Sequence, residues 1–162
     1  MMLNKLTALC ALCLLQAPAW AQEADEPPAL EALQEDPNVA EVRGLVQEAK
    51  DKLADGRKKR GGARLGSFKD ALKTFSRAWR SMTGLQIESE SLSAEINSGF
   101  EELLGDAAVQ RELKDLEERL TTHLSAKDFS KAYDAAEELH QLNSRAREYD
   151  YMMRVLPSLL PR

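Results

Sequence analysis

Apolar residues recur at steps of three and four along most of residues 38–154, which is the spacing of one face of an α-helix. The pattern is clearest in residues 67–82, where the apolar face consists of Phe68, Ala71, Leu72, Phe75, Ala78 and Trp79. No stretch of useful length in this region alternates polar and apolar residues at period two, which a half-buried strand requires. The sequence therefore predicts an all-α fold.

Glycine, proline and capping residues divide this pattern into about five helices. They are predicted at about 38–55, 67–82, 85–104, 106–124 and 128–154. The expected N-caps are short polar residues, whose side chains accept hydrogen bonds from the first free N–H groups of a helix. They are Asn38, Ser67, Asp106 and Asp128. Four glycines within 56–66 predict a loop, because glycine in a helix costs about 1 kcal/mol relative to alanine. A frayed extension of the first helix through the basic residues of this stretch is the alternative. We expect the helices to pack as antiparallel hairpins.

The first 21 residues have the features of a signal peptide. Lys5 supplies a positive charge, residues 6–15 form an apolar run, and Ala19-Trp20-Ala21 offers the small residues that a signal peptidase requires. The apolar run is shorter than the roughly 20 residues of a transmembrane helix. We therefore expect cleavage before Gln22 and an exported chain, periplasmic or secreted. The composition of this segment is typical of a Gram-negative bacterium.

Residues 22–37 are acidic and rich in proline and alanine, so they predict a linker before a helical domain at 38–162. Both cysteines lie in the signal peptide, so the mature chain has no disulfide to stabilise it. Removing Lys5 makes the net charge one unit more negative than the −5 of the full chain. This balance argues against nucleic-acid binding, which favours an excess of positive charge.

Residues 66–79 resemble the second helix of a tetratricopeptide repeat. That helix begins with a glycine, and an aromatic residue, an alanine, a second aromatic and a second alanine follow at fixed positions. The residues at these positions here are Gly66, Phe68, Ala71, Phe75 and Ala78. Phe129 and Ala132 repeat part of the pattern. The resemblance covers about half of the mature chain and implies helical hairpins of about 34 residues each. An irregular helical bundle is the alternative.

No motif predicts catalysis, a metal site or a cofactor. Glu137-x-x-His140 has the spacing of half a di-iron ligand set, but His123 has no glutamate at the matching position. A solvent-facing histidine is therefore the favoured interpretation. The sequence has no His-Glu-x-x-His, phosphate-binding glycine loop or Gly-x-Ser-x-Gly. We expect no enzymatic activity, and an enzyme with an unrecognised site is the least favoured alternative.

Two sets of residues are candidates for contact with a partner. The first set would contact an acidic partner or an anionic membrane surface, or else form only a solvated loop. This basic cluster consists of Arg57, Lys58, Lys59, Arg60 and Arg64. Aromatic residues would line a partner groove or fill the core: Phe68, Phe75 and Trp79. The main hypothesis is an exported protein–protein interaction or scaffold module. The alternative is an envelope- or membrane-associated structural factor that attaches through the basic loop 57–64.

Overall fold

The computed structural model describes residues 36–160, and this part of the chain is helical without a strand. The predicted all-α fold is confirmed. The elements are α1 (Pro37–Lys58), α2 (Gly61–Gly84), α3 (Glu90–Leu104), α4 (Ala107–Ser125), α5 (Phe129–Leu142), α6 (Arg147–Val155) and a short 3₁₀ helix, η1 (Leu156–Leu159). The predicted signal peptide, and the linker up to residue 35, lie outside the described residues.

The first helix begins one residue earlier than predicted. Asp36 caps α1, because its carboxylate accepts a hydrogen bond of 2.8 Å from the backbone N–H of Asn38. The predicted cap at Asn38 is therefore wrong. Pro37 takes the first helical position, where its missing N–H needs no partner and its fixed φ suits the helix.

The other expected caps have mixed outcomes. Asp106 caps α4 and Asp128 caps α5, as predicted, through hydrogen bonds from the first free N–H groups of each helix. Ser67 is wrong as a cap, because it lies inside α2 and is buried.

The glycine-rich stretch 56–66 is not a loop. The helix α1 continues to Lys58 and α2 begins at Gly61, whose φ of +55° forms the turn between them. Gly56 is retained within α1 because the ring of Phe68 packs against it, and a Cβ atom there would lie 2.5 Å from that ring. The close packing of α2 on α1 thus outweighs the low helix propensity of glycine.

The helix predicted at 85–104 is shorter in the structure. Ser89 caps α3 by accepting a hydrogen bond from the backbone N–H of Leu92, at 3.4 Å. Leu85, the first residue of the predicted helix, lies in the connection before α3 and is 49% exposed. The chain reverses at Gln86, whose φ is +54°.

The single helix predicted at 128–154 is divided into α5 and α6. The break contains Ser144, whose backbone N–H and hydroxyl donate to the hydroxyl and the carbonyl oxygen of Ser76, at 3.3 and 3.1 Å. Ser76 is fully buried in α2, so these bonds tie the break to the core. The break, at residues 143–146, contains neither glycine nor proline, and sequence periodicity therefore gives no sign of it.

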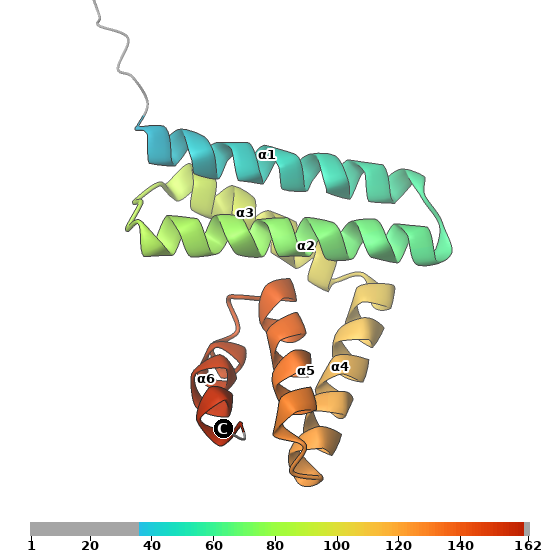
Figure 1. Ribbon diagram of the computed structural model, residues 1–162. Coiled ribbons are helices and arrows are strands. Elements are labelled where there is room, and N and C mark those ends of the chain that lie inside the picture. The colour runs from blue at the N-terminus through green and yellow to red at the C-terminus, as the bar shows by residue number, and fades with distance from the viewer. Residues whose placement is uncertain (1–35, 161–162) are drawn as a thin grey trace, which may run out of the picture. The chain divides into compact units, whose positions relative to one another are not determined.

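The helix α2 is the central element of the described chain. It forms an antiparallel hairpin with α1, α3 packs against both, and α4 and α5 form a second antiparallel pair that runs across α2 (Figure 1). The short α6 and η1 pack on α5. Phe75 of α2 and Phe100 of α3 are both fully buried, with ring centroids 6.1 Å apart.

Gly99 allows α3 to approach α2 at the centre of this core. A Cβ atom added at Gly99 would lie only 2.3 Å from Cζ of Phe75. Because the Phe75 ring is fully enclosed, it has no free space into which it can turn. Any side chain at this position would therefore push α3 away from α2.

Gly99→Ala should lower the free energy of unfolding by about 1–3 kcal/mol, because it overpacks the contact with Phe75. Gly44→Ala is the matched control: Gly44 is exposed on α1 and has no atom within 4 Å of the added Cβ. It should raise stability by about 0.5–1 kcal/mol, through helix propensity and a less flexible unfolded chain. Urea denaturation followed by circular dichroism measures both. Equal stability of the two variants would show that α3 does not pack on Phe75.

Candidate functional site

An open groove of about 520 Å³ lies between α1 and α3. Its residues come from three helices: Lys50, Leu53 and Arg57 of α1, Phe75 of α2, and Ala94, Glu95, Ser98, Gly99 and Glu102 of α3. Two hollows on the outer face of α4 are lined by polar residues alone. The groove between α1 and α3 therefore differs from them, because it combines charged walls with an apolar base.

Two ion pairs cross this groove. Lys50 pairs with Glu95 and Arg57 pairs with Glu102, and the guanidinium Nε of Arg57 is 2.9 Å from the Glu102 carboxylate. Seven residues separate the two pairs on each helix, so the pairs repeat after about two helical turns. Because the order of the partners is the same on both helices, α1 and α3 run in the same direction. We call these four residues the charge ladder.

The charge ladder is exposed to solvent. The side chains of Lys50 and Glu95 are 43% and 38% exposed, and those of Arg57 and Glu102 are 59% and 44% exposed. Exposed pairs of this kind contribute only about 0–1 kcal/mol each to stability. The two pairs therefore set the electrostatic character of the groove more than they hold α1 and α3 together.

The base of the groove is apolar and lies on the buried core. Leu53 and Phe75 belong to the buried core, while Ala94 and Ser98 present small side chains to solvent. Gly99 adds no side chain between them. Because Ala94 and Ser98 are small, another element can approach the backbone of α3 closely.

The predicted basic cluster is not a loop, and most of its charges are already neutralised. All five residues are exposed. Three of them form ion pairs within the described chain: Arg57 with Glu102, Lys59 with Asp55, and Arg64 with Asp106. The guanidinium of Arg64 also lies 4.9 Å from the centre of the Phe68 ring. Lys59 and Arg64 thus act within the fold, and Arg57 belongs to the charge ladder of the groove.

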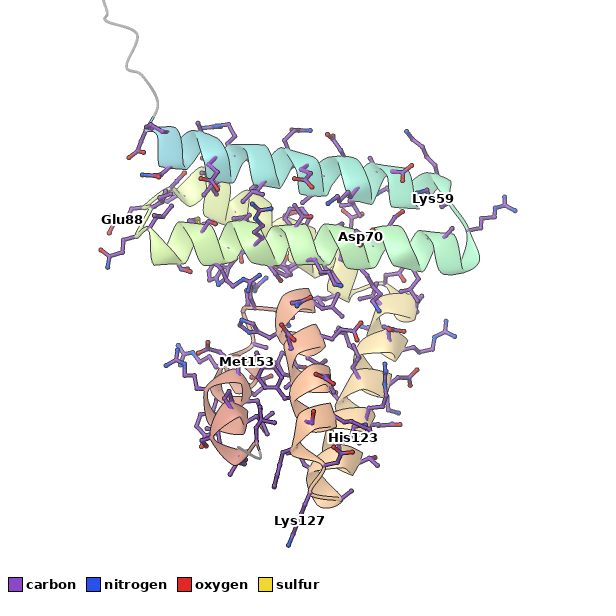
Figure 2. All side chains as sticks on the ribbon, in the orientation of Figure 1. Lys59, Asp70, Glu88, His123, Lys127 and Met153 are labelled. Atoms are coloured by element: carbon purple, nitrogen blue, oxygen red, sulfur yellow. The ribbon has the colours of Figure 1, made fainter. Side chains whose placement is uncertain are left out.

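Lys58 and Arg60 are the two members of the cluster without an ion-pair partner among residues 36–160. They flank Lys59, which Figure 2 shows at the connection between α1 and α2, while Glu88 lies at the opposite end of this hairpin. The exposed positive charge of the cluster is therefore confined to one end of the hairpin.

The three candidate aromatic residues belong mainly to the core. Phe68 is 3% exposed and Phe75 is fully buried, whereas Trp79 is half-buried against the core. Phe75 alone lies directly beneath the base of the groove, where it is covered by other residues. Of the two roles considered for these residues, Phe68 and Phe75 have the core role, and Trp79 packs partly against the core.

A second charged cluster connects three helices. The ammonium group of Lys69 on α2 donates to Glu112 of α4 at 2.7 Å and to Glu138 of α5 at 2.9 Å. Burial lowers the pKa of Lys69, but the hydrogen bonds to the two carboxylates outweigh it and raise this pKa overall. The hydrogen bond from Lys69 lowers the pKa of Glu138, against a smaller opposing effect of burial. This cluster ties α4 and α5 to α2 by charge as well as by packing.

The histidines do not form a metal site with the acidic residues around them. His140 is half-buried rather than solvent-facing, and its Nδ1, like Oδ1 of Asn143, has no hydrogen-bond partner within the described chain. Burial lowers the pKa of His140, Arg80 lowers it further, and Asp150 opposes them. His123 lies near the end of α4 (Figure 2). Residues 36–160 contain no cluster of three or more His, Cys, Asp or Glu that could hold a metal ion.

Sequence reasoning missed Lys50, Glu95 and Glu102 as candidate site residues. The available signal was the spacing of seven that separates Lys50 from Arg57 and Glu95 from Glu102. This spacing places each pair of like charges on one helix face. What the sequence does not show is that the two faces meet.

Among the described helices, none combines the length and the apolar composition needed to cross a membrane. Comparison with known proteins gives no relative: no family model, no curated protein and no solved structure matches the chain. The function is therefore argued from the geometry of the chain itself.

Lys69→Met should lower the free energy of unfolding at pH 7 by about 1 kcal/mol, because it leaves two facing carboxylates without their cation. Because the pKa of Glu138 is lowered on folding, its carboxylate stabilises the fold at pH values above 4.5, the ordinary pKa of this group. This stability is lost as the pH falls through the pKa of Glu138 in the folded state. Urea denaturation between pH 7 and pH 3 should therefore show a smaller loss of stability for Lys69→Met than for the wild type.

The control for this prediction is Lys114→Met. Lys114 pairs with Glu118 at 3.7 Å in a setting where the two side chains are 74% and 66% exposed. Its loss should change stability by less than about 0.5 kcal/mol. If the two methionine variants behave alike at every pH, the Lys69 cluster does not stabilise the fold.

Proposed function

We propose that this chain is an exported, non-catalytic helical protein that binds another protein through the groove between α1 and α3. The observation that carries the proposal is the combination, in one open groove, of an apolar base with walls of opposite charge. Binding surfaces for protein segments have this composition, in which an apolar centre supplies affinity and a charged rim supplies specificity. Export rests on the signal-peptide features of residues 1–21.

The fold supports a preformed groove. Leu53 and Phe75 at its base are part of the main core, and α3 is held to α2 by the contact between Gly99 and Phe75. A groove with a fixed base loses little conformational freedom on binding, which favours affinity. Grooves between helices are a common docking place for amphipathic segments of partner proteins.

The resemblance to tetratricopeptide repeats is part of this proposal. The antiparallel pairs α1–α2 and α4–α5 support a scaffold made of helical hairpins. The first hairpin extends from Pro37 to Gly84, which is longer than the about 34 residues of one repeat. The proposal therefore depends on the groove and not on membership of that family.

Ala94→Trp should abolish capture of the partner, because Ala94 is exposed in the groove and an indole there would fill it. The bait is the mature chain recovered from the periplasm, in which N-terminal sequencing should find Gln22 first. Thr122→Trp is the matched control, since Thr122 is exposed on α4, outside the groove. A protein retained by the wild type and by Thr122→Trp should be at least about tenfold depleted with Ala94→Trp. Equal retention by Ala94→Trp would contradict the proposal.

A membrane- or envelope-associated role is the second candidate, favoured by Lys58 and Arg60, which are exposed and form no ion pair among residues 36–160. Each basic residue near an anionic membrane contributes about 1 kcal/mol to binding, so two give only weak attachment. If this role holds, pelleting with phosphatidylglycerol vesicles should fall at least about tenfold in the double variant Lys58→Ala/Arg60→Ala and be unchanged in Ala94→Trp. Pelleting that is absent, or insensitive to the double variant, would eliminate this candidate.

A further inference from the structure

We propose that the segment bound in the groove is an amphipathic α-helix with acidic residues along one edge and basic residues along the other, each repeating every seven residues. This inference rests on the proposed function of the groove and specifies the chemistry of its partner. It is drawn from the charge ladder and from the composition of the groove base.

The dimensions of the groove favour a helix as the occupant. It extends between the two steps of the charge ladder, seven residues apart, which corresponds to about 10.5 Å, or two turns of a helix. Its two walls are neighbouring helices that run in the same direction, so a third helix can lie over the seam between them, as in a helical bundle. The small, exposed residues Ala94 and Ser98 on the α3 wall allow the close approach that such packing needs.

The walls carry opposite charges with the same repeat. The wall formed by α1 presents Lys50 and Arg57, and the wall formed by α3 presents Glu95 and Glu102. A helix with an acidic edge beside α1 and a basic edge beside α3 would meet each wall with the opposite charge. A helix with the same charge on both edges would meet one wall with a like charge.

The charge ladder can exchange its partners at small cost. Its pairs are exposed and add little to stability, so opening them costs little. Once a helix covers the groove, any wall charge left without a partner is shielded from water and unpaired, which is strongly unfavourable. The charge ladder would thus contribute mainly to specificity, by rejecting helices whose edges carry the same charge as the wall beside them.

Three synthetic peptides of about three heptads test this inference. They share one apolar face and differ only in their edges: the mixed peptide has Glu on one edge and Lys on the other, and the remaining two have Glu on both or Lys on both. Fluorescence anisotropy measures their binding to the mature chain. The mixed peptide should bind at least about tenfold more tightly than either of the others.

Reversal of one wall should change which peptide is preferred. Glu95→Lys/Glu102→Lys makes both walls basic and should favour the peptide with Glu on both edges. Lys50→Glu/Arg57→Glu makes both walls acidic and should favour the peptide with Lys on both edges. Lys114→Glu, on the outer face of α4, should leave the preference of the wild type unchanged. If a reversed wall impairs folding, the neutral variant Glu95→Gln/Glu102→Gln should still bind the Glu-edged peptide better than the wild type does.

The outcomes separate this inference from the proposed function. The inference is overturned if the mixed peptide does not bind at up to about 100 µM, or if reversal of a wall leaves the order of affinities unchanged. If the Ala94→Trp variant still fails to retain the captured partner in that case, the groove binds a protein of another kind and the proposed function stands. If the Ala94→Trp variant retains as much partner as the wild type, both proposals fall.

Discussion

The contact between the Phe75 ring and the backbone of α3 at Gly99 is the constraint on which the rest of the structure depends. It lets α3 lie close against α2, and α2 in turn packs along α1 where the Phe68 ring covers Gly56. With both contacts in place, α1 and α3 become neighbours that run in the same direction. The groove between them and its charge ladder follow from this packing.

The helical class and most of the core follow from periodicity. Leu92, Ile96 and Phe100 are fully buried on α3, as their spacing predicts. Two features depend on contacts between distant residues and so had no local signal. Gly56 continues a helix because Phe68 covers it. The break between α5 and α6 is stabilised by bonds from Ser144 to Ser76, 68 residues away.

The candidate site was only partly predictable for the same reason. A run of basic residues attracts attention in the sequence, but Lys59 and Arg64 are paired within the fold. The residues that define the groove are distributed over three helices, and Glu95 reaches Lys50 across 45 positions. Spacing can place two like charges on one helix face, but only the packing of α1 against α3 makes the two faces meet. Phe75, predicted from helical periodicity, lies beneath the groove as a buried core residue.

The most direct test of the account is to map the partner's footprint on the mature chain by NMR. Amide signals of the isotope-labelled chain would be compared before and after addition of the partner isolated by capture. If the groove is the binding site, the largest changes should fall in residues 50–57 of α1 and 94–102 of α3. Changes concentrated on α4, or at the connection between α1 and α2 around Lys59, would show that binding occurs elsewhere and contradict the assignment of the groove.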